Sequence, residues 1–95
     1  NWFTKPFDKD FVAISACAAG WLVNRGIRLI GVDSPSIQKY YDPKDTHVIL
    51  LQDEVVVLEG LNLEGVEEGL YDLICLPISA AGCEGVPARA ILKKL

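Results

Sequence analysis

The sequence has no methionine, only one histidine, and three cysteines without a CxxC spacing. The odd cysteine count gives no simple disulfide framework, and the positions of Cys17, Cys75 and Cys83 do not suit a cysteine zinc site. We therefore expect reduced thiols and a cytoplasmic protein. Because the chain starts at Asn1 and contains no methionine, we also expect it to be a piece of a longer protein.

Basic charge and long apolar runs are also scarce. The chain has 9 basic and 13 acidic residues, a formal net charge of -4, and its few basic residues are scattered. This balance argues against a nucleic-acid partner. The apolar segment 11–23 is preceded by Asp8 and Asp10, where a signal peptide would be basic, and Arg25 follows too early for a membrane span. We therefore expect no membrane association either.

The sequence predicts one continuous globular block, 1–95. Their apolar fraction of 51% is sufficient for a core, and no repeat or linker divides them. Ser15 is placed to cap a helix of about ten residues and Gly26 to end it. The other expected elements are an extended segment 11–14, strands at 27–33, 54–59 and 71–79, a short helix at 47–53 capped by Asp45 or Thr46, and an extended tail after Gly82 and Gly85. This alternation predicts an α/β or mixed α+β domain.

The stretch THVILLQDEVVVLEGLNLEGV, residues 46–66, contains the single histidine, His47, and a carboxylate, Glu59, after four apolar residues. An unpaired carboxylate heading for the interior would be costly, so Glu59 needs a partner. A helix from residue 47 advances roughly 9 Å by residue 53 at 1.5 Å per residue. A returning strand over 54–59 covers roughly 16 Å at 3.3 Å per residue, which carries Glu59 back to the level of His47. The two side chains could then share a proton or a metal ion.

Residue types alone leave other interpretations open, because two ligands do not make a metal site. The simpler alternative is that His47 lies in the first turn of a helix and Glu59 accepts hydrogen bonds from backbone amides. The cluster of Asp33, Ser34 and Ser36 follows a strand, as many active sites do, yet it is also an ordinary turn, which we favour. The remaining candidates are weaker: Cys75 as a core residue, Cys83 in a turn, Arg89 in an ion pair, and Tyr40 and Tyr41 beside a ligand.

The order of five segments carries a resemblance. The segments are AAGWLVNRGIRLIGVDSPSI, THVILL, VLEGLNL, LICLPI and GVPARA. Together they resemble the C-terminal half of the metal-dependent hydrolases called putative cyclases, which include kynurenine formamidases and isatin hydrolases. The resemblance covers nearly all 95 residues.

The resemblance implies a function and a fold. Members hydrolyse an amide or lactam bond through a metal-bound hydroxide, and their C-terminal histidine and glutamate, which correspond to His47 and Glu59, complete a second metal position for zinc or manganese. Their other ligands and catalytic histidine belong to an N-terminal His-x-Gly-Thr-His-x-Asp motif, which this sequence lacks. We therefore assign no catalytic residue to this chain and expect it to be inactive alone. The implied fold is the C-terminal half of a swivelling β/β/α domain, associated with the missing half or self-associated as a dimer or tetramer.

A non-enzymatic alternative remains. In that hypothesis the chain is a small assembly or binding domain that has kept the scaffold without the catalytic half. It is supported by the absence of the N-terminal motif from these 95 residues. Metal binding that depends on His47 would separate the two hypotheses.

Overall fold

The computed structural model describes residues 2–42 and 45–95, which fall into two compact units, one up to residue 64 and one from residue 65 onward. In chain order the elements are a 3-10 turn Trp2–Thr4, α1 Ala16–Asn24, β1 Leu29–Gly31, α2 Thr46–Gln52, β2 Val56–Leu58, β3 Tyr71–Pro77 and β4 Ala88–Lys94. The predicted mixed α+β class is confirmed. Each unit is described separately below.

Helix α1 begins and ends at the predicted signals. The Ser15 hydroxyl accepts a hydrogen bond from the backbone N–H of Ala18 at 3.1 Å, which pairs one of the free N–H groups of the first turn. At the other end Gly26 has φ +80°, a left-handed conformation that glycine adopts at little cost. Ala19 is fully buried on the inner face of the helix. The local sequence is therefore sufficient to define this element.

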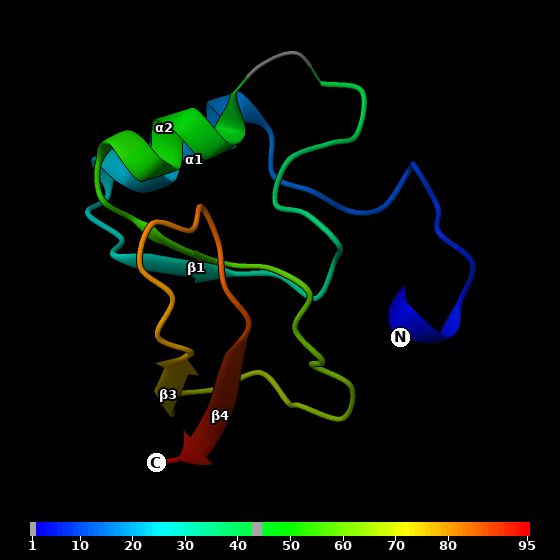
Figure 1. Ribbon diagram of the computed structural model, residues 1–95, viewed down its shortest axis with the longest axis vertical. Coiled ribbons are helices and arrows are strands. Elements are labelled where there is room, and N and C mark those ends of the chain that lie inside the picture. The colour runs from blue at the N-terminus through cyan, green and yellow to red at the C-terminus, as the bar shows by residue number, and fades with distance from the viewer. Residues whose placement is uncertain (1, 43–44) are drawn as a thin grey trace. The chain divides into compact units, whose positions relative to one another are not determined.

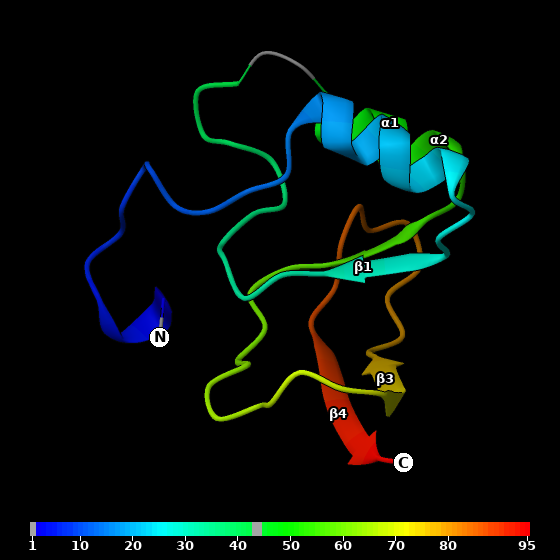
Figure 2. The same cartoon turned by 180° about the vertical axis from the view of Figure 1, so that it is seen from behind.

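Strands β1 and β2 form a parallel pair in the first unit, with Leu29 opposite Val56 and Gly31 opposite Leu58. Helices α1 and α2 lie side by side on one side of this pair, as both views of the ribbon show (Figures 1 and 2). The fully or almost fully buried core residues are Ala19, Ile37, Leu50 and Val55. The core therefore lies between the two helices and the two strands.

The chain reverses between α2 and β2 as predicted. Helix α2 ends at Gln52, and Glu54 takes the left-handed conformation with φ 59°, which few non-glycine residues adopt. Helix α2 is also fixed at its start, because the buried Thr46 hydroxyl donates to the carbonyl of Ile14 at 3.0 Å. The start of α2 is thus fixed by a contact with a distant segment, and its end is followed by a local turn.

Both strand predictions for the first unit were too long. The strand expected over 27–33 covers only Leu29–Gly31, and the strand expected over 54–59 covers only Val56–Leu58. The left-handed turn at Glu54 delays the start of β2. The segment 11–14, expected to be extended, forms no strand. Its backbone N–H groups donate to two separate carbonyls, Phe11 to Asp8 at 3.3 Å and Ile14 to Ile37 at 2.8 Å, so no ladder forms.

The second unit is an antiparallel hairpin of β3 and β4, paired from Tyr71 with Lys94 to Pro77 with Ala88. The extended tail and the end of β3 at Pro77 agree with the sequence. The prediction that β3 is buried is wrong, because Leu73, Ile74 and Leu76 are 39%, 43% and 59% exposed. Its apolar run was typical of a strand covered on both faces, whereas this ribbon of two strands leaves its apolar side chains largely accessible.

Candidate functional site

The site is built where the loop after β1 meets the segment after β2. The N–H of Val32 donates to the carbonyl of Leu58 at 3.0 Å, and the N–H of Gly60 donates to the carbonyl of Ser34 at 2.8 Å. Because the strands are parallel, both loops leave the pair at the same end, the carboxyl end of the strands. These bonds hold Glu59, which lies between Leu58 and Gly60, against residues 34–38.

His47 and Glu59 meet as the spacing predicts. His47 Nε2 lies 2.9 Å from Glu59 Oε2, which is hydrogen-bond distance. Their side chains are 38% and 33% exposed. Glu59 therefore does not lie in the interior, contrary to what the four apolar residues before it indicated. Val55 is buried but the backbone carries Glu59 past the core to its edge, where water and ligands have access.

Glu59 also accepts a hydrogen bond from the backbone, as the simpler interpretation proposed. The N–H of Ile37 donates to Glu59 Oε2 at 2.7 Å. Partial burial acts to raise the pKa of Glu59, but this bond, together with the hydrogen bond and charge of His47, acts more strongly in the opposite direction. The Ser36 hydroxyl adds a smaller contribution, and the pKa of Glu59 is lowered from its ordinary 4.5. The carboxylate is therefore held in its charged form.

Gln38 contacts His47 from the other side. Gln38 Oε1 accepts from the backbone N–H of His47 at 3.2 Å and lies 3.1 Å from the ring atom Nδ1. Gln38 Nε2 donates to the carbonyl of Asp42 at 3.2 Å. Sequence reasoning missed this residue, because it lies in a polar loop nine positions before His47 and no local pattern links the two.

A cavity of about 270 Å³ opens beside His47. Its other lining residues are Phe7, Phe11, Pro35, Ser36, Gln38, Lys39 and Tyr40. The rings of Phe7 and Tyr40 pack edge to face with centroids 5.8 Å apart. The cavity is therefore lined partly by aromatic rings and partly by the polar side chains of Ser36, Gln38 and His47. The sequence indicated Tyr40 and Tyr41 as residues that could flank a ligand, but it gave no signal for Phe7 or Phe11.

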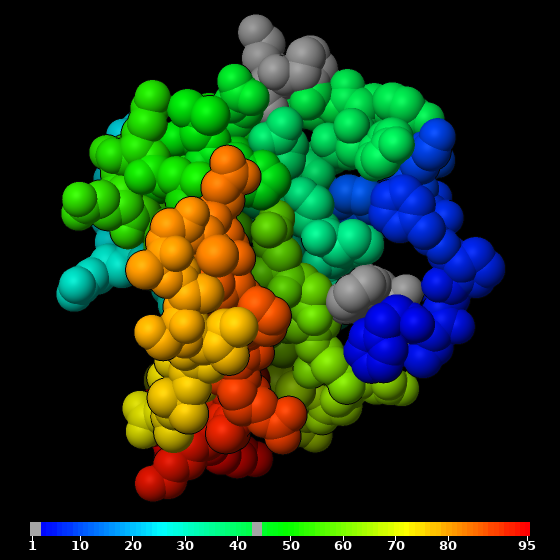
Figure 3. All heavy atoms as spheres, in the orientation of Figure 1, coloured from blue at the N-terminus to red at the C-terminus, as the bar shows by residue number. Residues whose placement is uncertain are grey.

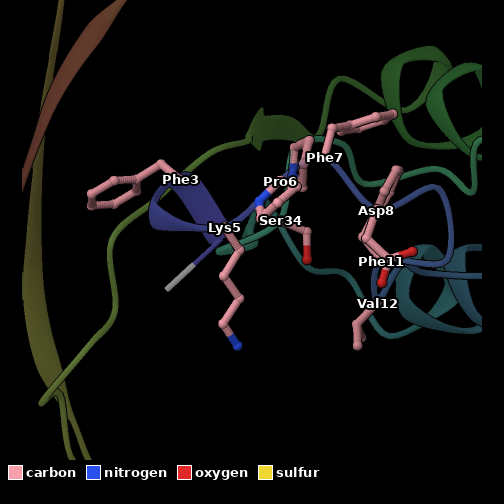
Figure 4. A pocket seen from close by; sticks show the side chains of 9 residues that line it. Phe3, Lys5, Pro6, Phe7, Asp8, Phe11, Val12 and Ser34 are labelled. Carbon is pink, nitrogen blue, oxygen red and sulfur yellow. The ribbon is translucent and has the colours of Figure 1, made fainter.

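A larger cavity of about 590 Å³ adjoins the first and shares Phe7, Phe11 and Pro35 with it. The surface is hollowed between the blue N-terminal segment and the green residues that follow β1 (Figure 3). Figure 4 shows that Lys5, Phe7 and Asp8 come from the N-terminal segment and Ser34 from the loop after β1. Both cavities are open clefts rather than enclosed voids.

The remaining sequence candidates do not join the site as reactive groups. Residues 33–35 form a bend, as favoured, and only Ser36 of that cluster reaches Glu59. Cys75 is half-buried in the hairpin and Cys83 is exposed, and both are free thiols. Arg89 lies on β4, where it is opposite Leu76 of β3 in the strand register.

Within residues 2–42 and 45–95, no group of three or more His, Cys, Asp or Glu side chains is placed to hold a metal ion. His47 and Glu59 are two donors of types that zinc and manganese accept. They could supply part of a metal site, with further ligands from elsewhere. No helix in the described part of the chain combines the length and apolar character needed to cross a membrane.

The sequence relatives of the chain are cyclase-like proteins and kynurenine formamidases, and the solved structures similar to it are described as metal-dependent hydrolases. The chain is homologous to one part of these proteins, spanning about 35–45% of their length. No protein-family model matches the chain. The predicted resemblance is thus confirmed.

Three relatives illustrate the similarity. Cyclase-like protein 2 of Arabidopsis thaliana is 44% identical over 92 residues, which are 95% of this chain and 34% of that protein. The kynurenine formamidase of Bordetella petrii is 41% identical over 96 aligned positions, covering 100% of this chain and 44% of the enzyme. A solved structure described as a potential metal-dependent hydrolase with cyclase activity has a TM-score of 0.87 and 32% identity over 95% of this chain and 45% of its own.

Proposed function

We propose that this chain supplies His47 and Glu59 as two ligands of a divalent cation, zinc or manganese, in a metal-dependent hydrolase that cleaves an amide or lactam bond. The observation that carries the proposal is the 2.9 Å separation of His47 Nε2 and Glu59 Oε2 at the open edge of the core. Atoms bound to one ion at about 2.0–2.2 Å lie roughly 3 to 3.5 Å apart, so a small side-chain adjustment suits both donors to one cation.

The residues of this chain act by binding and positioning. When bound, a divalent cation polarises a carbonyl group and activates water for hydrolysis. Ile37 N–H and the Ser36 hydroxyl hold the Glu59 carboxylate charged, the form that ligates metals. The cavity beside His47 would receive the part of a small-molecule substrate next to the reacting bond.

The remaining ligands and the catalytic histidine are proposed to come from the part of the relatives that this chain does not span. Under this proposal the 95 residues alone hydrolyse nothing, and the working protein is cytoplasmic. The chain associates with that part or with further copies as a dimer or tetramer. Exposed apolar side chains on the hairpin, such as Leu73, Ile74 and Ile91, support such association.

Metal analysis of the protein, purified in the longest reading frame that contains these residues, tests the proposal. His47→Ala and Glu59→Gln should each lose most of the bound zinc or manganese and the hydrolysis of aryl formamides or lactams. Glu54→Gln is a matched control, because Glu54 is an exposed glutamate at the turn before β2. If His47→Ala and Glu59→Gln proteins retain the full metal content, these residues are not ligands and the proposal is wrong.

A further inference from the structure

We propose that Gln38 is a positioning residue that keeps the hydrogen of the His47 ring on Nδ1 and so presents Nε2 with its lone pair toward the metal site. This inference rests on the proposed function for its purpose, but its structural content stands on the contacts of Gln38 alone. It goes beyond the two ligands, since Gln38, which also lines the cavity, acts on the metal site through His47.

The orientation of the Gln38 amide is fixed by two bonds whose direction is certain. The backbone N–H of His47 can only donate, so the Gln38 atom 3.2 Å from it is the amide oxygen. The carbonyl of Asp42 can only accept, so the Gln38 atom 3.2 Å from it is the amide nitrogen. A flipped amide would place its NH₂ group against the N–H of His47 and its oxygen against the carbonyl of Asp42, and both contacts would be repulsive. The assignment of Oε1 therefore follows from the network.

The fixed oxygen selects the ring tautomer. Gln38 Oε1 lies 3.1 Å from His47 Nδ1 and is only an acceptor, so this contact is favourable only when Nδ1 carries a hydrogen. In a neutral imidazole Nε2 then has a free lone pair, and it faces Glu59 Oε2, which already accepts from Ile37. Two acceptors at 2.9 Å attract only when a positive charge lies between them. The arrangement thus favours a cation, either a proton or a metal ion, between His47 and Glu59.

Gln38 has a structural role as well, which the test must separate. Asp45, the N-cap residue of α2, makes no side-chain cap hydrogen bond within the described chain. Gln38, nine residues before His47, provides the missing cap hydrogen bond, because its side-chain oxygen accepts from the N–H of His47 in the first turn of α2. Loss of Gln38 would therefore weaken the helix start even if the ring contact had no consequence. Only a measurement on the ring itself distinguishes the two roles.

The test uses NMR of the full protein loaded with zinc and labelled with nitrogen-15 at histidine, with the His47 ring assigned through bonds to its own backbone signals. In the wild type, Nδ1 should carry a hydrogen whose proton signal lies far downfield and exchanges slowly with water, because Gln38 Oε1 accepts from it. In Gln38→Leu this hydrogen loses its acceptor, so its signal should move upfield and exchange faster. Gln38→Glu keeps an acceptor at this position and should restore the wild-type signal.

Gln52→Leu serves as the matched control, because Gln52 is an exposed glutamine at the end of the same helix. Its ring signals should equal those of the wild type, and circular dichroism should show that α2 persists in every variant compared. An unprotonated Nδ1 in the wild type would overturn the inference. So would an Nδ1 hydrogen with the same chemical shift and exchange rate in the wild type and in folded Gln38→Leu.

A second measurement separates this inference from the proposed function. In the full protein, Gln38→Leu should bind zinc about 10–100-fold more weakly, as expected when the partner of a ligating histidine is removed. If His47→Ala abolishes metal binding while Gln38→Leu leaves the affinity unchanged, the proposed function stands and the role of Gln38 is refuted. If no variant changes metal binding, the proposed function fails, while the tautomer result still decides the structural claim.

Discussion

Ile37 is fully buried, yet its backbone N–H donates to the partly exposed carboxylate of Glu59 at 2.7 Å. One residue therefore anchors the loop after β1 in the core by its side chain and holds a candidate ligand by its backbone. Its carbonyl also accepts from Ile14 N–H at 2.8 Å. The position of the carboxylate is thus tied directly to core packing.

The lowered pKa of Glu59 predicts a specific dependence of stability on pH. Because the folded-state value lies below the ordinary 4.5, the unfolded chain takes up its proton first as the pH falls. The stability that Glu59 contributes is present above about pH 4.5 and is lost as the pH falls through the folded-state value. Urea unfolding of metal-free protein from neutral to acid pH should therefore show a steeper loss for the wild type than for Glu59→Gln. Parallel curves for the two proteins would contradict this, and Glu54→Gln should follow the wild type.

Two adjacent leucines of α2 should differ sharply on truncation. Leu50 is 0% exposed and lies in the core, whereas Leu51 is 57% exposed. Leu50→Ala removes buried methyl groups and leaves a cavity, so it should lower the free energy of unfolding by about 2–5 kcal/mol. Leu51→Ala should change it by less than about 1 kcal/mol, since that side chain is mostly in water. Urea denaturation measures both, and similar losses would show that the core is placed wrongly.

Two glycines of the α1 region should respond to alanine with opposite signs. Gly20 lies inside α1, and a Cβ added there would meet no atom within 4 Å, so Gly20→Ala should stabilise the chain by about 0.5–1 kcal/mol. Gly26 has φ +80°, which strains any residue with a Cβ, so Gly26→Ala should destabilise it by about 1 kcal/mol or more. Thermal unfolding midpoints should therefore move in opposite directions. A raised midpoint for Gly26→Ala would contradict the left-handed helix end, and a lowered one for Gly20→Ala would contradict the free space at that position.

The N-cap of α1 provides a further test. Ser15→Ala removes the acceptor for the N–H of Ala18 and should cost about 1 kcal/mol of stability. Ser15→Asn keeps a side-chain oxygen at the cap and should retain most of that stability. If alanine and asparagine have the same effect, the hydroxyl contact contributes little to the helix start.

Local signals predicted part of this structure. The cap at Ser15, the stop at Gly26 and the spacing of His47 and Glu59 all act within one element or across one reversal, so the sequence contains their causes. The bonds from Ile37 and Gln38 could not be predicted in the same way. They join residues 22 and 9 positions apart and depend on how the loop after β1 packs. The burial of β3 was misjudged because an apolar run does not reveal how many faces of a strand are covered.

The pairing of β1 with β2 has a consequence for assembly of the site. Gly31 stands opposite Leu58, so Glu59 immediately follows the last paired residue. A slip by one residue would reverse the face of its side chain, and a slip by two would move it about 6.6 Å along the strand. Under the proposed function, an ion held jointly by Glu59 and His47 would stabilise only one of these alignments. Metal binding would then favour the native pairing of β1 and β2 over the shifted ones.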